Sequence, residues 1–262
     1  MCIRDRIYAL VGARAETREG RWTHDLSAQI ADITRDTFGP FGRSNSSEGD
    51  RIKASYVSAF RMADEHNLTV AADYEVEGFR NATPGGFAFN GRREIEQLGF
   101  VGEYRYSGEA FDLSAAIRHD INDRFRDATT LRVGAGYRLT DTTRLRAAAG
   151  SAVKNPGFFE LFGFVDGRFI GNDALRPEKS TGWEAGVDQD LGTSARLSVT
   201  YFDSGLEGEI FTTFPPPNFI ATPANRTTVS DQRGVEVALS ARFAEQWSLD
   251  AAYSYLDAEE DG

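Results

Sequence analysis

The stretches SAVKNPGFFELFG (residues 151–163) and GNDALRPEKSTGWEAG (residues 171–186) contain the most specific pattern in this chain. They read as the end of one strand, a long loop, and a new strand that begins near Gly182. The loop is rich in Gly, Asn and Pro, which favour turns over regular strands. The arrangement predicts two neighbouring strands joined by a long connection.

Apolar and polar residues alternate with a period of two over many segments, which is the primary signal for a strand with two different faces. In the clearest segment, Leu131, Val133 and Ala135 alternate with Arg132 and Gly134. Most segments exceed the 5–6 residues usual in soluble sheets and suit the roughly 9–11 residues that cross a bilayer at a tilt. Twelve strands are predicted, at residues 7–16, 21–32, 51–62, 68–78, 94–106, 110–119, 130–139, 143–153, 182–191, 195–206, 229–243 and 247–257.

The connections between these segments alternate between short and long. Short turns are predicted at residues 17–20, 63–67, 107–109, 140–142, 192–194 and 244–246. Long loops are predicted at residues 33–50, 79–93, 120–129, 154–181 and 207–228. Outer-membrane barrels have short turns at one end and longer loops at the other. The sequence therefore favours an all-β, antiparallel up-and-down transmembrane β-barrel over a soluble β-domain.

The two faces of the predicted strands differ in chemistry. Aromatic residues gather near strand ends on the apolar face, as expected for rings that settle at the two membrane interfaces. The other face carries charges that a dry protein core would hold only at high cost. We predict the apolar set Leu131, Val133, Ala135, Leu239, Ala241, Leu249 and Ala251 outside the barrel. The charged set Arg132, Arg138, Glu236 and Arg242 is predicted inside.

Composition and motifs exclude several classes of protein. The net charge of −11 over 262 residues argues against nucleic-acid binding, which needs a basic surface. No run approaches 18 apolar residues, so no membrane-spanning helix is predicted. Cys2 is the single cysteine, and His24, His66 and His119 are far apart in the predicted strands and turns. No catalytic motif is present, and the sequence predicts neither an enzyme nor a metal or cofactor site.

From the sequence of its two ends, we expect the chain to be a fragment of a longer protein. Residues 1–6 carry charges but no apolar segment follows them, so they do not form a signal peptide. We expect residues 1–6 to be an artefactual leader and residues 7–262 to be a partial barrel domain.

The stretch at 151–186 resembles the loop signature of TonB-dependent outer-membrane receptors. It departs from the signature at Val153, Asn155 and Asp173. A second piece, Gly234-Val235-Glu236 after Asn225, is similar to the pattern that opens a later strand in the family. The signature positions kept here are Lys154, Pro156, Glu160, Leu161, Gly163, Gly171, Asn172, Leu175, Pro177, Glu178, Ser180, Glu184 and Gly186.

The resemblance implies a 22-stranded barrel around an N-terminal plug, of which about twelve strands are present here. It is closest to the vitamin B12 and catecholate-siderophore branch. It implies a bacterial outer-membrane receptor for energy-coupled uptake of a scarce, bulky nutrient, with membrane lipid, the siderophore or cobalamin-like ligand and the TonB complex as partners. TonB would act through the missing plug. The alternatives are a passive porin or adhesin barrel, and a soluble carbohydrate-binding β-domain.

Two loops hold the candidate site residues. In the signature loop these are Lys154, Pro156, Glu160, Gly171, Asn172, Pro177, Glu178, Ser180 and Glu184, which either fold the loop against the barrel rim or face the ligand. In the other loop, Phe214 and Phe219 flank three prolines that favour an extended segment. These two rings are candidate ligand contacts, and the alternative is a rigid spacer.

Overall fold

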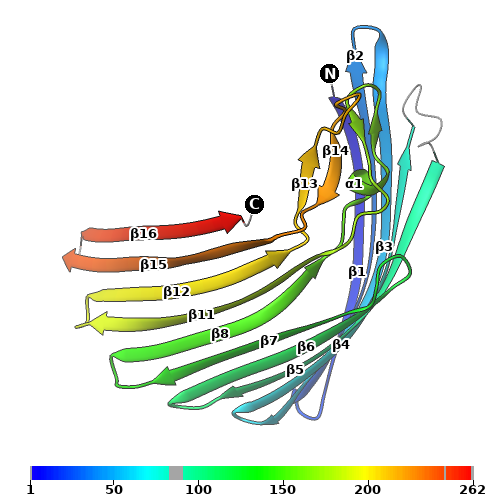
Figure 1. The fold of residues 1–262 in the computed structure, drawn as a ribbon. Coiled ribbons are helices and arrows are strands. Elements are labelled where there is room, and N and C mark those ends of the chain that lie inside the picture. Colours follow the sequence, from blue (N-terminus) through cyan, green and yellow to red (C-terminus); the bar gives the residue numbers. More distant parts are fainter. Residues whose placement is uncertain (1, 83–90, 245, 261–262) are drawn as a thin grey trace.

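The computed structural model describes residues 2–82, 91–244 and 246–260, and places most of them in one curved antiparallel sheet (Figure 1). The sheet has twelve strands, and each pairs with its neighbours in chain order without a crossover. The up-and-down topology predicted from the sequence is thus confirmed. The strands are β1 (Cys2–Thr17), β2 (Trp22–Gly39), β3 (Gly42–Ala63), β4 (His66–Asn81), β5 (Gly91–Ser107), β6 (Phe111–Asn122), β7 (Ala128–Arg138), β8 (Thr143–Lys154), β11 (Glu178–Leu191), β12 (Ala195–Glu207), β15 (Val229–Ala244) and β16 (Trp247–Glu260).

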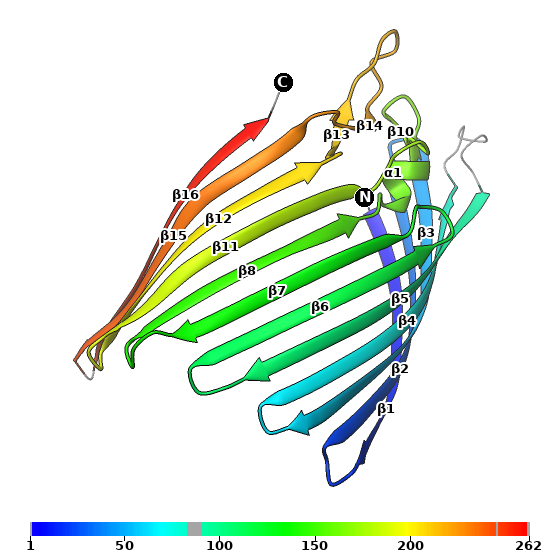
Figure 2. The ribbon, with the colours of Figure 1, turned by 60° about the horizontal axis from the view of Figure 1, so that its bottom comes forward.

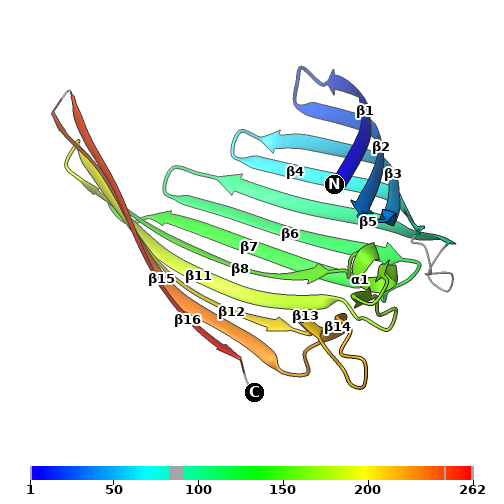
Figure 3. The same cartoon turned by 90° about the horizontal axis from the view of Figure 1, so that it is seen from above.

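Five small elements lie in the two longest connections. The α1 loop (residues 155–177) contains α1 (Phe158–Phe162) and a two-stranded ladder of β9 (Phe164–Val165) and β10 (Phe169–Ile170). The β13–β14 loop (residues 208–228) is a small hairpin of β13 (Ile210–Thr213) and β14 (Thr222–Asn225). Figure 3 shows α1 on the concave side of the curved sheet.

The predicted loop at residues 33–50 is wrong. β2 and β3 run through this range and stay paired from Asp32 opposite Asp50 to Gly39 opposite Gly42. Eleven of the 18 residues in this range are polar or charged, as suits a ribbon in water, and the few apolar ones do not alternate with them, so no period-two pattern marked the extension as strand. The predicted loop at 120–129 shrinks to residues 123–127, and residues 83–90 of the predicted loop at 79–93 lie outside the described residues.

Residues 2–6, expected to belong to an artefactual leader, lie in β1. Their backbone pairs with residues 33–37 of β2. The artefactual origin of residues 1–6 stays a prediction.

The connections divide the molecule into two ends. The α1 loop, the β13–β14 loop and the tip of the β2–β3 hairpin lie at one end, here called the loop end (Figures 1 and 2). The short turns, such as residues 139–142 and 192–194, lie at the opposite turn end. This follows from the topology, because two strands separate each loop-end connection from the next.

The strand register assigns every side chain to one of two faces, because cross-strand partners share a face. Leu131 pairs with Ile117, and Arg132 pairs with Ala116. Continued through the sheet, the register puts Leu131, Val133, Ala135, Leu239, Ala241, Leu249 and Ala251 on one face. It puts Arg132, Arg138, Glu236 and Arg242 on the other.

The charged face is the concave one. Asn155 of the α1 loop, which lies in the concavity, donates to Oε1 of Gln97 at 3.5 Å. Gln97 pairs with Asn122 and so shares the face of Arg132. The apolar set therefore faces outward on the convex side, as predicted.

The convex face has the surface of a membrane-spanning wall. Its aliphatic side chains are about half exposed, for example Leu131 at 54%, although the strands that carry them are hydrogen-bonded to their neighbours. Aromatic pairs lie toward both ends, with Trp22 against Phe60 at 5.8 Å near the turn end and Trp183 against Tyr201 at 5.4 Å toward the loop end. Such a large apolar surface needs a nonpolar environment to cover it. No helix in the described part of the chain is long and apolar enough to cross a bilayer.

Candidate ligand-facing surface

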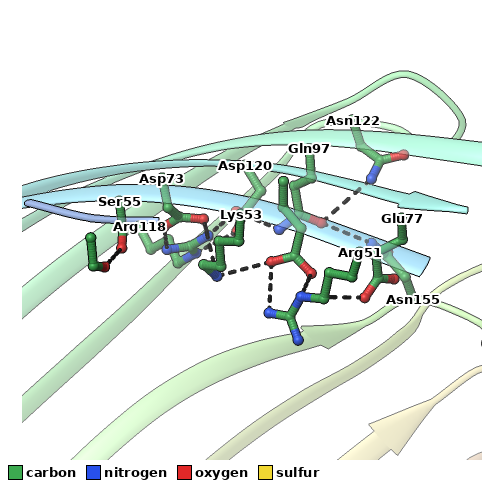
Figure 4. A network of polar contacts seen from close by, with 12 residues as sticks. Arg51, Lys53, Ser55, Asp73, Glu77, Gln97, Arg118, Asp120, Asn122 and Asn155 are labelled. Carbon is green, nitrogen blue, oxygen red and sulfur yellow. Dashed lines mark hydrogen bonds and ion pairs between the residues drawn. The ribbon is translucent and has the colours of Figure 1, made fainter. Parts of the chain in front are cut away.

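The concave face of β3 to β6 carries a network of ion pairs (Figure 4). The guanidinium of Arg118 binds both carboxylate oxygens of Asp73, at 2.8 and 3.1 Å, and also donates to Asp120 at 2.6 Å. Lys53 contacts Glu75 at 2.9 Å and Asp73 at 3.7 Å. The charges compensate one another across neighbouring strands, which allows them to line a wet concavity without an unpaired charge.

The same network reaches the loop end. Arg51 binds Glu75 at 2.6 Å and lies 3.8 Å from Glu77. Beyond Glu77, a cavity of about 220 Å³ separates the wall from the start of the α1 loop, and Gln97 and Asn155 line it. The polar wall therefore reaches the underside of the α1 loop, where Phe125 and Phe158 also line the cavity.

A second network lies on the concave face of β8, β11 and β12. Arg146 is 3.8 Å from Glu184 and 3.6 Å from Asp188. Asp188 also accepts from Ser198 at 2.6 Å and pairs with Arg196 at 3.2 Å. Glu184, a signature position, is thus part of the exposed polar wall.

Lys154 and Glu178 close the base of the α1 loop. Nζ of Lys154 donates to Oε2 of Glu178 at 2.6 Å, and Oε1 of Glu178 accepts from the backbone N–H of Ile210 at 2.7 Å. Glu178 is only 7% exposed. The hydrogen bond to Glu178 raises the pKa of Lys154, which lies at the loop end of β8, beyond the aromatic row of Trp183. This pair fastens both long connections at one point.

Other signature residues form hydrogen bonds within the α1 loop and from it to the β13–β14 loop. Oε2 of Glu160 accepts from the backbone N–H of Gly157 at 2.6 Å at the start of α1. The side chain of Asn172 donates to the carbonyl of Pro223 at 3.0 Å and accepts from the N–H of Ala174 at 3.0 Å. These bonds satisfy backbone groups that a loop would otherwise leave unpaired.

The α1 loop also has its own small apolar core. Leu161 is 2% and Leu175 4% exposed, and Pro156 is buried, whereas Pro177 is half-buried. A Cβ on Gly171 would lie 2.8 Å from the backbone of Leu161, so only glycine fits there. These signature positions therefore include buried packing contacts within the α1 loop and its end.

The α1 loop is held over the concave face by aromatic contacts. The ring of Phe158 stacks on that of Phe79 of β4 at 5.7 Å. The guanidinium groups of Arg124 and Arg93 lie over the ring of Phe162 at 4.8 and 5.6 Å. Asn45 of the β2–β3 hairpin donates to the carbonyl of Phe164 at 3.0 Å.

The predicted contact rings lie apart from these anchors. Phe214 is 59% and Phe219 65% exposed in the segment that joins β13 to β14. Ser180, the last signature position, is half-buried on the concave face, opposite Ala152 and Leu206. The structure therefore brings the signature residues together but leaves Phe214 and Phe219 outside their cluster.

Sequence reasoning missed the network around Arg118. Its members Lys53, Asp73 and Glu75 alternate with apolar residues on β3 and β4, so the period-two pattern carried the signal. What the pattern lacked was the register that brings Lys53 opposite Glu75. In the described residues, no cluster of three or more His, Cys, Asp or Glu side chains is placed to hold a metal ion.

Fold and surfaces together define one wall of a transmembrane β-barrel with a polar concave face and folded loops at one end. A family model described as "TonB dependent receptor-like, beta-barrel" matches residues 4–262. The chain belongs to this family of bacterial outer-membrane receptors. The match extends well beyond residues 151–186 and 225–236, which carry the resemblance.

Two curated relatives share part of this sequence. The metal-pseudopaline receptor CntO of Pseudomonas aeruginosa (strain UCBPP-PA14) is 32% identical over 148 residues, which are 53% of this chain and 19% of that protein. The vitamin B12 transporter BtuB of Photobacterium profundum is 29% identical over 167 residues, 61% of this chain and 25% of that protein.

Solved structures show the same fold at low sequence identity. The siderophore receptor PirA from Pseudomonas aeruginosa superimposes with a TM-score of 0.83 and 18% identity, over 98% of this chain and 48% of that one. A mutant of the ferric enterobactin receptor PfeA from the same organism, in complex with enterobactin, gives 0.83 and 15% identity, over 97% and 44%. The chain spans about half the length of these receptors.

Proposed function

We propose that the receptor containing this chain takes up a scarce, bulky nutrient, a ferric siderophore or cobalamin, across the bacterial outer membrane with energy supplied through TonB. The observation that carries the proposal is the family match over residues 4–262. The curved sheet agrees with it, because the concave face is polar and the long loops gather at one end. Relatives named as receptors for a metal chelate, vitamin B12 and siderophores support the class of cargo.

In this proposal the two loops have different roles. The signature residues, with Lys154 and Glu178 at their base, hold the α1 loop over the concavity. Phe214 and Phe219 are exposed at the loop end and contact the ligand there. Exposed rings on a proline-containing segment suit this role, because little conformational freedom is lost when a ligand is bound.

The partners follow from the surfaces. The convex face contacts membrane lipid, and the TonB complex acts through a plug domain outside this chain. No role for nucleic acid, a cofactor or catalysis is proposed.

Uptake by the intact receptor in a strain lacking its own siderophore and cobalamin receptors tests this proposal. Accumulation of the radiolabelled nutrient should stop when the tonB gene is deleted or a protonophore collapses the proton gradient. Binding at the cell surface should persist in both cases. Uptake that continues without TonB and the proton gradient would instead establish the passive porin.

A further inference from the structure

The α1 loop and the β13–β14 loop lie against each other at the loop end, where Figure 2 shows β10 beside β14. Phe169 of β10 forms a parallel bridge with Ala221, and the N–H of Ile170 donates to the carbonyl of Ala221 at 3.0 Å. Residues 171–176 then continue along β14 outside any named strand. The two loops therefore share a line of contact in addition to their common base at Glu178.

Side-chain amides take the place of a regular ladder along this line. Nδ2 of Asn172 donates to the carbonyl of Pro223 at 3.0 Å. Oδ1 of Asn225 accepts from the backbone N–H of Arg176 at 2.9 Å, and Nδ2 of Asn225 donates to the carbonyl of Arg176 at 2.9 Å. A side-chain amide has the donor and the acceptor of a peptide group, so Asn225 pairs with Arg176 as a residue of a neighbouring strand would. The two asparagines are here called the clasp.

Asn225 also closes the base of its own hairpin. Its Nδ2 donates to the carbonyl of Gly208 at 2.7 Å, where the hairpin begins with a left-handed backbone at a φ of 68°. One side chain thus binds the backbone of both loops. Because its oxygen and its nitrogen are engaged in these bonds, Asn225 acts on a ligand only through the loops that it joins.

The clasp connects the outermost rings of the loop end to the concave wall. Phe214 and Phe219 are exposed in the β13–β14 loop, whereas the α1 loop is seated on the wall through Phe158, whose ring stacks on Phe79 at 5.7 Å. An isolated two-stranded hairpin is at best marginally stable in water. The direction of the β13–β14 hairpin therefore depends on what holds it, and the clasp ties it to a loop that rests on the wall.

We propose that the clasp makes the two loops one body, here called the cap, and that Asn172 and Asn225 are positioning residues for nutrient binding. Through the α1 loop they fix Phe214 and Phe219 relative to the concave wall. A segment held in its binding arrangement loses less conformational freedom when the nutrient binds, which raises affinity. The positioning role rests on the proposed function, whereas the cap rests only on the contacts between the loops.

Pulsed electron paramagnetic resonance tests the cap without any nutrient. Spin labels are attached to the intact receptor through R168C on the α1 loop and N218C on the β13–β14 loop, in a Cys2→Ser background. The parent should give one narrow distribution of distances between the labels. N172A/N225A should broaden it, because three hydrogen bonds between the loops are lost.

The matched control for this measurement is T212A/T227A. It removes two exposed side chains from the same hairpin without touching the clasp, so its distance distribution should equal that of the parent. Resistance to heat in unboiled gels verifies that each variant folds. A distribution as narrow in N172A/N225A as in the parent would overturn the cap.

Nutrient binding to whole cells tests the positioning role. The probe is radiolabelled cyanocobalamin or a radiolabelled ferric catecholate siderophore, whichever the parent accumulates. N172A/N225A should bind it about tenfold more weakly, and T212A/T227A should bind it as the parent does. F158A, which removes the stacking on Phe79, should weaken binding about threefold in the parent.

The decisive comparison is F158A in the two backgrounds. In N172A/N225A it should have no further effect on affinity, because the seat on the wall reaches the rings only through the clasp. Equal losses from F158A in both backgrounds would contradict the positioning role.

A disulfide in place of the clasp supplies a rescue. Phe169 and Ala221 are bridge partners, and neighbouring strands bring such residues within the reach of a disulfide. F169C/A221C, added to N172A/N225A in the Cys2→Ser background, should restore the affinity of the parent when oxidised and lose it again in dithiothreitol. Weak binding in both redox states would contradict the positioning role.

The proposed function and the cap fail in different ways. A parent that accumulates neither probe would refute the proposed function. The distance distributions would still decide the cap, because they are measured without a nutrient.

Discussion

At the scale of single residues, Glu178 joins the two long connections at the loop end. One carboxylate oxygen binds Lys154 before the α1 loop, and the other accepts the backbone N–H of Ile210 in the β13–β14 loop. A buried acceptor shared by two loops makes their folding interdependent. A glutamate at this position can hold both connections because its two carboxylate oxygens accept one hydrogen bond from each.

Replacing Glu178 with alanine should loosen both loops together. The change leaves the N–H of Ile210 without its acceptor, which costs about 1–3 kcal/mol. Hydrogen-exchange mass spectrometry of the intact receptor should show faster exchange in β13 and in the α1 loop. Glu184→Ala, on the same strand and face but exposed at 3.8 Å from Arg146, is the control and should leave exchange unchanged. Unchanged exchange of β13 in Glu178→Ala would show that Ile210 is held by other contacts.

The sequence singled out Glu178 as a signature position but gave no indication of its contacts. Pro156, Gly171 and Pro177 contributed to the prediction of a long loop rich in turns, because Gly and Pro favour particular backbone conformations. The partners of Glu178 come from β8 and from β13, which only the fold brings together. Local patterns report a residue's own conformational needs, whereas a contact with Ile210 depends on the path of 31 intervening residues.

At the scale of elements, strand parity decides what each side chain meets. Twelve predicted strands were found because their convex faces need apolar residues at every second position. The extension of β2 and β3 at residues 33–50 was missed because a ribbon in water has no such need. Sequence periodicity therefore detects the part of a strand that faces lipid and not the part that continues beyond it.

A charge on the convex face tests this parity. Val133→Arg places a cation where Ala115 and Ala149 are its cross-strand neighbours, and should destabilise the intact barrel by about 2–4 kcal/mol. Ala148→Arg, on the concave face opposite Glu184, should cost much less. Urea unfolding of the receptor in lipid vesicles measures both. A larger loss for Ala148→Arg would reverse the assignment of the two faces.

The β13–β14 loop offers a test of ligand contact. Deleting Phe214–Phe219 removes two rings that are 59% and 65% exposed. The deleted segment lies between β13 and β14, outside the strands of the twelve-stranded sheet. Binding of the nutrient to whole cells should weaken, while heat-stable assembly of the barrel stays intact. A shortened loop of the same length as the deletion product but with both rings retained is the control. If the deletion variant binds the nutrient as tightly as the parent does, the segment acts only as a spacer.

At the scale of the whole molecule, the loops and turns mark two sides of a membrane. Two strands separate each loop-end connection from the next, so every long connection emerges on one side. Outer-membrane barrels carry their longer connections outside the cell. The polar β2–β3 extension, which projects beyond the apolar face at this end, agrees with that orientation.

Cysteine labelling in intact cells tests the orientation directly. Phe41, fully exposed at the tip of the β2–β3 hairpin, and Asp141, in the turn between β7 and β8, are replaced singly by cysteine in a Cys2→Ser background. A membrane-impermeant maleimide should label the Phe41→Cys receptor on whole cells. The Asp141→Cys receptor should react only after the outer membrane is opened, because its turn faces the periplasm. If only the Asp141→Cys receptor is labelled on whole cells, the barrel has the opposite orientation. The β13–β14 loop would then face the periplasm and could not contact an external ligand.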